Sequence, residues 1–230
     1  MSEPVRKPLS RMRKAIIKSM TASALVPQFM IESEPSVAAL GEQRSRLAGD
    51  SPVSYSDVFV ATCARALRRF PAVNSSLVDD AILEHQEVNI GLAISLSDGL
   101  IAPAIRGADG LTLAEIAAER ERLSAAAREN ALSAEDMFST TFTVSNLGPF
   151  GVRRFRALVV PPQAAILALG AITPDRTLSL SLSCDHRVLD GAGAAEFLGH
   201  LVDLIEAPGW LAELSSPSVS SAVPKPAGSG

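Results

Sequence analysis

This chain of 230 residues has few aromatic residues, no excess of positive charge and no long apolar run. Only 4% of the residues are aromatic, which argues against clustered rings that would stack the bases of single-stranded nucleic acid. The formal net charge of −4 gives no general attraction to phosphate backbones, so we expect no nucleic-acid partner. No run approaches the roughly 18 apolar residues of a membrane span, and no apolar signal core follows the N-terminus. We therefore expect neither membrane insertion nor secretion.

Cysteine and histidine are also few, and this limits the chemistry available to the chain. Cys63 and Cys184 lack the spacing of metal ligands, so we expect no metal site and a reducing, cytoplasmic location. The three histidines are His85, His186 and His200. Because histidine is the side chain that titrates near neutral pH, an acid–base enzyme would have to draw on this short list.

The apolar pattern predicts a single α/β sandwich domain. Alternating residues predict strands over 88–95, 100–105, 141–145, 164–171 and 178–183. Helices are predicted to start at a Ser10 cap, over 56–69, at the capping boxes of 112–115 and 133–136, and from 191 until Pro208. Strands and helices mix without a regular βαβ rhythm, which favours one domain over 1–214. The Ser/Pro-rich segment 215–230 is predicted to be a disordered tail.

The three histidines differ in their surroundings. His85 lies in a polar turn before a strand, where a surface role is expected, and His200 lies beside the apolar stripe of the last helix, where a packing role is expected. His186 follows the serine-rich strand directly, Asp190 comes four residues later, and Gly191 opens a helix. Functional residues are common at such strand ends. The spacing alone leaves a functional and a structural role for His186 equally open.

Ser145, at the end of the strand over 141–145, is a second candidate. Its hydroxyl is either an ordinary turn group or a donor to developing negative charge, because no G-x-S-x-G elbow surrounds it to make a hydrolase nucleophile. Cys184 lies two residues before His186, but we do not expect a cysteine–histidine nucleophile.

Two segments together resemble one known family. Residues 185–191 read D-H-R-V-L-D-G and match the D-H-R-x-x-D-G motif of dihydrolipoamide acyltransferase catalytic domains, the cores of 2-oxoacid dehydrogenase complexes. Residues 141–148 read T-F-T-V-S-N-L-G and are similar to that family's T-F-T-I-S-N-L-G segment. Further similar segments follow the family's order over 8–16, 70–74, 88–91 and 161–167. The resemblance extends from about Lys7 to Leu214.

The resemblance implies the fold of chloramphenicol acetyltransferase, a CoA-dependent acyltransferase built as an α/β two-layer sandwich with a mixed sheet and assembled as a homotrimer. The active site of that family lies in a channel between subunits, which CoA and the acyl acceptor enter from opposite ends. On this sequence His186 would be the general base, and Ser145 of the facing subunit would be the oxyanion donor. Asp190 would be a structural acid that holds the histidine loop through a basic partner, for which we expect Arg13.

The surroundings of these residues depart from the family pattern. A basic cluster, Arg153, Arg154 and Arg156, follows Ser145 and is either a solvated strand edge or a contact for CoA phosphates or an acidic carrier protein. Gln28 replaces the histidine of the family's P-H-F segment. A retained catalytic pair in altered surroundings favours the same reaction with a changed acceptor.

We therefore expect a CoA-dependent acyltransferase with acetyl-CoA as substrate, without a metal and without a lipoyl attachment site in this chain. Family members carry lipoyl and partner-binding domains upstream, for which the short segment before Pro8 leaves no room. The main expectation is a stand-alone O-acetyltransferase acting on a small-molecule or carrier-linked hydroxyl, as in tetronate antibiotic biosynthesis. One alternative is the dihydrolipoamide acyltransferase core of a 2-oxoacid dehydrogenase complex. The other, a non-catalytic trimeric scaffold, is disfavoured by the presence of His186, Asp190 and Ser145.

Overall fold

A six-stranded mixed sheet forms the centre of the protein, in the order β1-β10-β9-β8-β4-β7. The computed structural model describes residues 3–47, 53–96 and 99–215, so nearly all of the expected tail lies outside the described residues. The strands of this sheet are β1 (Gln28–Ser33), β4 (Ile90–Leu92), β7 (Ala104–Ile105), β8 (Phe142–Asn146), β9 (Ala165–Leu169) and β10 (Leu180–Asp185). β4, β8 and β9 run parallel, and antiparallel strands continue the sheet on both sides. The expected mixed sheet is confirmed.

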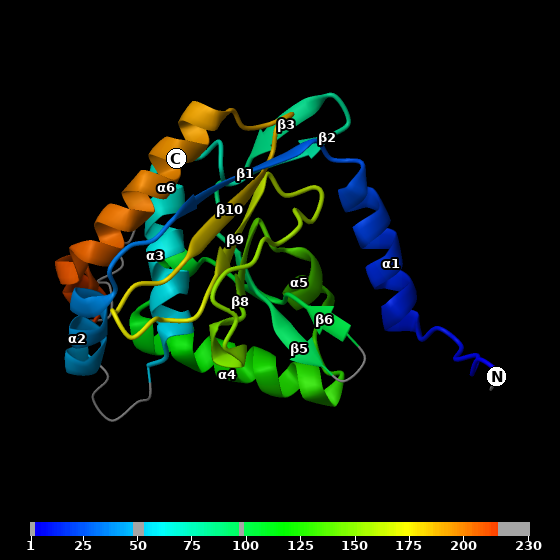
Figure 1. Ribbon diagram of the computed structural model, residues 1–230, viewed down its shortest axis with the longest axis horizontal. Helices are drawn as coiled ribbons and strands as arrows, with labels where there is room; N and C mark the ends of the chain where they lie inside the picture. The colour runs from blue at the N-terminus through cyan, green and yellow to red at the C-terminus, as the bar shows by residue number, and fades with distance from the viewer. Residues whose placement is uncertain (1–2, 48–52, 97–98, 216–230) are drawn as a thin grey trace, which may run out of the picture.

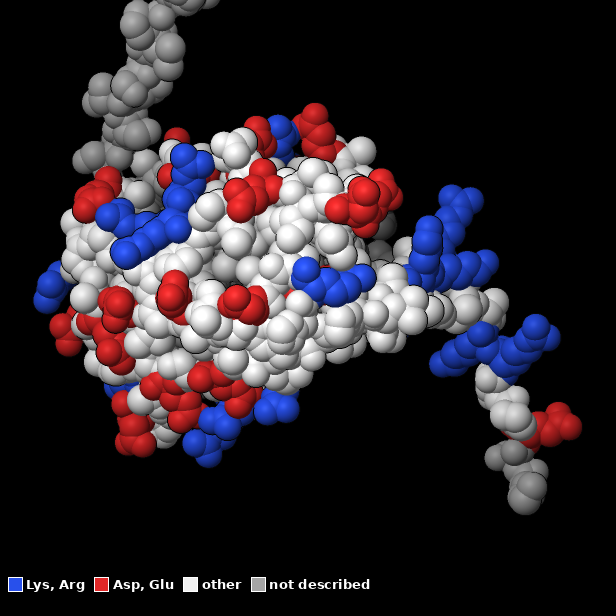
Figure 2. Space-filling model, turned by 90° about the horizontal axis from the view of Figure 1, so that it is seen from above, with Lys and Arg blue, Asp and Glu red and all other residues white. Residues whose placement is uncertain are grey.

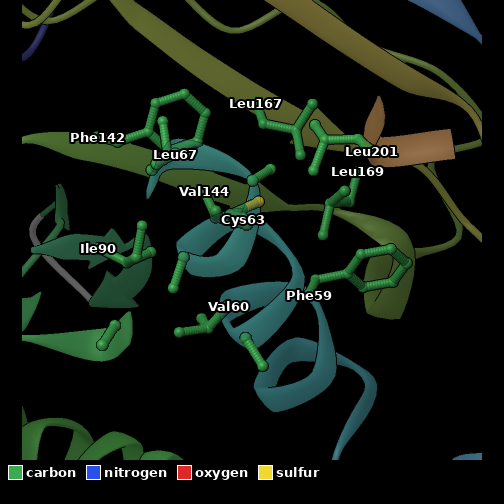
Figure 3. Packing of buried hydrophobic residues seen from close by; sticks show 14 of the residues in the cluster. Phe59, Val60, Cys63, Leu67, Ile90, Phe142, Val144, Leu167, Leu169 and Leu201 are labelled. Atoms are coloured by element: carbon green, nitrogen blue, oxygen red, sulfur yellow. The ribbon is translucent and has the colours of Figure 1, made fainter. Parts of the chain in front are cut away.

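Helices pack on one face of this sheet and form the second layer of the sandwich (Figure 1). They are α2 (Ala38–Leu47), α3 (Tyr55–Arg69), α4 (Leu113–Glu129) and α6 (Gly191–Glu206). Figure 3 shows the core between the layers, where Cys63 and Leu67 of α3 lie close to Val144 and Phe142 of β8. Phe142 is completely buried, and truncating such a ring to alanine typically costs about 3–5 kcal/mol.

The helix starts lie where side-chain caps predict them. Ser10 accepts a hydrogen bond from the main-chain N of Arg13 and opens α1 (Arg11–Ala24). Capping boxes open α3, α4 and α5 (Ala134–Phe138), each with a reciprocal carboxylate bond to the cap residue. These bonds satisfy main-chain donors that the first helical turn leaves unpaired. The predicted capping boxes of 112–115 and 133–136 are therefore confirmed.

The single strand predicted over 88–95 is wrong, because the chain divides it between two sheets. β4 joins the central sheet, and β5 (Ile94–Leu96) pairs with β6 (Gly99–Ile101) in a separate hairpin. The strand predicted over 100–105 is also divided, at Pro103, whose carbonyl accepts a hydrogen bond from Leu92 N at 3.1 Å. A proline has no N–H to continue the ladder, so the pairing stops there.

The remaining elements lie at the margins of the sandwich. A second hairpin consists of β2 (Ser75–Val78) and β3 (Ala81–Glu84), and three 3-10 segments are Ala108–Gly110, Gly148–Phe150 and Pro208–Ser215. α1 projects from the body, and Figure 2 shows Lys and Arg side chains gathered on this projection. None of the described helices is long and apolar enough to cross a bilayer.

Candidate functional site

His186 lies in a tight loop between β10 and α6. The buried Asp185, the last residue of β10, accepts hydrogen bonds from Arg187 through Nε at 2.9 Å, Nη2 at 2.6 Å and the main-chain N at 2.9 Å. The Asp185 carbonyl accepts main-chain N–H bonds from Val188 at 3.0 Å and Leu189 at 2.9 Å. His186 is exposed between these anchored residues. The loop therefore presents the imidazole to solvent on a fixed backbone.

β1 and the residue before it supply the other contacts of the histidine. His186 N donates to the Pro27 carbonyl at 2.9 Å, and the His186 ring lies 4.7 Å from the Phe29 ring at an angle of 57°. Gln28, between them, donates from its side-chain amide to the Ser23 carbonyl at 2.9 Å and so ties this segment to the end of α1. The glutamine that departs from the family pattern thus has a structural role here.

Ser145 lies near the carboxyl end of β8 and is only 8% exposed. Its Cα is paired with Ala168 of β9, which is paired in turn with Ser181 of β10. Among the described residues, the Ser145 hydroxyl has no hydrogen-bond partner. His186 comes five residues after Ser181, which is about 16 Å along the strand at roughly 3.3 Å per residue. One subunit therefore does not bring the predicted base and the predicted oxyanion donor together.

Asp190 has a well-defined local role as the N-cap of α6. Its Oδ1 accepts a hydrogen bond from Gly193 N at 2.8 Å. α1, which carries Arg13, lies on the other side of the molecule from the start of α6 (Figure 1). The pairing of Arg13 with Asp190 is therefore not an arrangement of the single subunit, and it stays a prediction for the assembled protein.

Two of the three arginines that follow the turn after Ser145 form ion pairs with Glu32 of β1 or with Glu34, which follows β1 directly. Arg154 forms ion pairs with Glu32 and Glu34, and Arg156 Nε donates to Glu32 Oε1 at 3.2 Å. The Arg156 guanidinium beside Glu32 holds the pKa of that carboxyl below its usual range. Of the three candidate CoA contacts, the structure thus pairs Arg154 and Arg156 internally and leaves Arg153 exposed. This arrangement favours the solvated-edge alternative.

Sequence reasoning missed a cavity of about 250 Å³ beside the end of β8, on the side of the sheet that α3 covers. Its wall is mostly apolar and comes from α3, the end of β8 and the turn after it, the end of β9 and the loop between β9 and β10. The cavity is lined by Tyr55, Phe59, Asn146, Gly148, Pro149, Leu169, Gly170, Ile172 and Leu178. Gly170 is required for this close packing, because a Cβ there would lie 2.0 Å from the Arg153 carbonyl oxygen. Such contacts between distant segments leave no local sequence signal.

Two arginines lie around Tyr55, at the wall of this cavity. The Arg44 guanidinium stacks 4.7 Å over the Tyr55 ring, and its Nη1 donates to the Val53 carbonyl at 2.7 Å. A Cβ on Gly41 would lie 2.5 Å from the Tyr55 hydroxyl and 3.1 Å from Arg176 Nη2, so both groups border this glycine. Arg44 Nε is buried without a hydrogen-bond partner, and neither arginine pairs with a carboxylate within the described residues. The arrangement offers positive charge beside an apolar cavity.

The other candidates have structural roles. Burial raises the pKa of the Cys184 thiol to about 12, so this cysteine is no nucleophile near neutral pH. His85 Nε2 and the Ser76 hydroxyl share a hydrogen bond of 2.7 Å, and burial lowers the pKa of His85. The His200 ring packs 5.7 Å from the Phe70 ring. No group of three metal-ligating side chains gathers in the described part of the chain.

Comparison with known sequences places the chain beside one group of enzymes. Residues 1–212 match the family of 2-oxoacid dehydrogenase acyltransferase catalytic domains. The chain is 39% identical over 218 residues to the dihydrolipoyllysine-residue acetyltransferase component 3 of the mitochondrial pyruvate dehydrogenase complex of Arabidopsis thaliana, covering 84% of this chain and 40% of that protein. It is 36% identical over 219 residues to the corresponding component of Rickettsia bellii, covering 87% and 52%. The chain thus spans about half the length of these relatives or less.

Comparison with solved structures gives the same result. Dihydrolipoamide acetyltransferase of Azotobacter vinelandii is 29% identical with a TM-score of 0.85, covering 91% of this chain and 94% of that one. A truncated catalytic core of the 2-oxoacid dehydrogenase multienzyme complex from Thermoplasma acidophilum is 30% identical with a TM-score of 0.84, covering 90% and 100%. Chloramphenicol acetyltransferase, at 14% identity and a TM-score of 0.53 over 82% and 94%, shares the fold. The expected fold class is therefore confirmed.

Proposed function

The chain belongs to the family of 2-oxoacid dehydrogenase acyltransferase catalytic domains, and from this premise we propose that it transfers an acetyl group between coenzyme A and the thiol of a dihydrolipoyl group. The relatives reported above are acetyltransferases that act on a dihydrolipoyllysine residue or on dihydrolipoamide. None of them is a hydroxyl acetyltransferase of tetronate biosynthesis. The expectation of a hydroxyl acceptor and of an antibiotic pathway therefore has no support among them, and the alternative of an acyltransferase core is favoured.

His186 is the general base of this reaction. A neutral imidazole takes the proton of the attacking thiol, and the sulfur attacks the thioester carbonyl carbon. When the tetrahedral intermediate collapses, the bond from carbon to the CoA sulfur breaks, and the imidazolium returns the proton to the leaving thiolate. No covalent bond to the protein forms at any step. No metal is needed, because proton transfer and hydrogen bonding supply the catalysis.

Ser145 donates a hydrogen bond to the tetrahedral oxyanion, which neighbouring groups of its own subunit leave it free to do. In the Azotobacter enzyme, the residues with a role in the catalytic mechanism include a serine, a histidine and an asparagine four residues beyond that histidine. Here Asp190 stands four residues after His186. We carry over the serine and histidine roles to Ser145 and His186, and we assign Asp190 to holding the histidine loop at the start of α6.

The separation of His186 and Ser145 along the sheet is the observation that carries the proposal. A distance of about 16 Å between them along the strand direction is too long for both to reach one thioester. The site must therefore combine His186 of one subunit with Ser145 of another. A closed ring of identical subunits repeats such a contact around its symmetry axis, which agrees with the expected homotrimer.

The cavity lined by Tyr55, Asn146 and Gly170 is the proposed place for part of the CoA chain. Its mostly apolar walls suit an extended, weakly polar chain. Arg44 and Arg176, both without a carboxylate partner in the described residues, would meet the CoA phosphates. They replace Arg154 and Arg156 in this role.

The test is acetyl transfer from acetyl-CoA to dihydrolipoamide, measured beside a panel of hydroxyl acceptors, with His186→Ala as the control. We expect transfer to dihydrolipoamide, reversible because one thioester replaces another, and no comparable rate with the alcohols. A higher rate with any hydroxyl acceptor would overturn the proposed acceptor and favour the O-acetyltransferase. Wild-type turnover in His186→Ala would overturn the proposed mechanism.

A further inference from the structure

We propose that the ion pair between Asp185 and Arg187 is the positioning device of the histidine loop, and that both residues act on the reaction only through His186. The inference rests on the proposed role of His186 as the general base. Neither residue is assigned a contact with substrate. Their task is to hold the backbone on either side of the histidine, so that the imidazole meets the thiol at the correct angle.

The Arg187 guanidinium and main-chain N–H hold the Asp185 carboxylate through several hydrogen bonds. The Asp185 side chain is 3% exposed, and both of its oxygens are engaged by the guanidinium, Oδ1 by Nε at 2.9 Å and Oδ2 by Nη2 at 2.6 Å. The same Oδ1 also accepts the main-chain N–H of Arg187 at 2.9 Å. A bidentate bond fixes orientation as well as distance. The residue between these two partners is His186.

The side chain of His186 has few restraints of its own. Its ring packs on Phe29 at 4.7 Å, and among the described residues it forms no hydrogen bond with either ring nitrogen. The direction of the imidazole is therefore set mainly by its backbone, which the pair holds from both sides and which the Pro27 carbonyl holds from β1. Misplacing a catalytic group by about 1 Å can cost roughly 10²-fold in rate.

The charges of the pair also cancel beside the base. The charged groups on the loop are Asp185, Arg187 and Asp190. The neighbouring residues from the other strands are uncharged: residues 27–29 at the start of β1, and Ala164, which directly precedes β9. Removing one member of the pair leaves the other as an uncompensated charge next to the imidazole. An unpaired cation disfavours imidazolium, and an unpaired carboxylate favours it.

The experiment compares Asp185→Asn, Arg187→Gln and the double variant, through kcat, KM for acetyl-CoA and the pH profile of kcat/KM. We expect each single variant to lower kcat about 10-fold or more while KM stays within about twofold. The acidic limb should move to lower pH in Asp185→Asn and to higher pH in Arg187→Gln, by about 0.5 pH unit. The double variant should return the limb to the wild-type position without restoring kcat, and Arg187→Lys should recover part of kcat.

Controls separate this inference from general stability and from the proposed function. Asp136→Asn breaks a comparable ion pair, with Arg122 at 2.7 Å, away from the loop, and it should leave the acidic limb in place. Wild-type kcat in both single variants, or limbs that move in the same direction, would overturn the inference while His186→Ala remained inactive. Activity in His186→Ala would instead overturn the proposed function itself.

Discussion

His186 and Ser145 lie toward opposite ends of the strands of one sheet, because β10 and β8 run in opposite directions, His186 follows the last residue of β10, and Ser145 lies near the carboxyl end of β8. A reaction that needs a base and an oxyanion donor at one carbonyl cannot use both from the same copy. Ser145 is buried within its own subunit, whereas His186 is exposed. This asymmetry suits a histidine that reaches a neighbouring copy.

Replacing Ser145 by alanine should lower kcat about 10²- to 10³-fold with little change in KM, since one donor to the oxyanion is lost. Steady-state kinetics with acetyl-CoA and dihydrolipoamide would measure this. Ser179→Ala is the matched control, because it removes another buried serine hydroxyl, one without a hydrogen-bond partner. An unchanged kcat in Ser145→Ala would remove the serine from the site.

Replacing Arg176 by glutamine should raise KM for acetyl-CoA about 10-fold and leave kcat nearly unchanged, because the arginine is proposed to meet phosphate rather than the reacting carbonyl. The effect should disappear when acetyl-pantetheine, which lacks the nucleotide phosphates, replaces acetyl-CoA. Arg154→Gln, which breaks the ion pairs with Glu32 and Glu34, is the control and should leave KM unaltered. A larger rise in KM for acetyl-CoA in Arg154→Gln than in Arg176→Gln would instead assign the CoA phosphate contact to the arginine cluster after Ser145.

Much of the fold and the site could be predicted from the sequence where the signal is local. The caps of α1, α4 and α5, the helix that begins at Gly191 and the place of His186 at a strand end all depend on neighbouring residues. The cavity lined by Tyr55, Gly170 and Leu178 could not be predicted, because these residues meet only through tertiary packing. The ion pairs of the arginine cluster could not be predicted for the same reason. Its partner Glu32 lies 124 residues before Arg156 in sequence.

Asp136 makes the protein sensitive to acid in a defined range. The Arg122 guanidinium beside it lowers the pKa of Asp136 to about 2 from its ordinary 3.8. A depressed pKa stabilises the folded state above pH 4, and this contribution is lost as the pH falls from about 4 to 2. Asp136→Asn should lower the free energy of unfolding at pH 7 by about 1–2 kcal/mol and flatten its pH dependence below pH 4. Urea unfolding at pH 7, 4 and 2 would measure both effects, and an unchanged slope between pH 4 and 2 would contradict the assignment.

Gly170→Ala should destabilise the protein and narrow the cavity, because the added methyl would overlap the Arg153 carbonyl oxygen. We expect a loss of about 1–3 kcal/mol in the free energy of unfolding, together with a higher KM for acetyl-CoA. Gly199→Ala is a suitable control, since a Cβ at that position meets nothing within 4 Å. Equal stability of the two variants would show that the backbone around Gly170 relaxes freely.

The most direct measurement is complementation between two inactive variants. His186→Ala and Ser145→Ala proteins are purified, mixed in equal amounts, dissociated and reassembled, and acetyl transfer to dihydrolipoamide is assayed. If each site takes its histidine from one subunit and its serine from the next, about a quarter of the sites in a randomly mixed ring contain both intact residues. We therefore expect recovery to about a quarter of the wild-type rate. A mixture no more active than its two components would contradict the shared site.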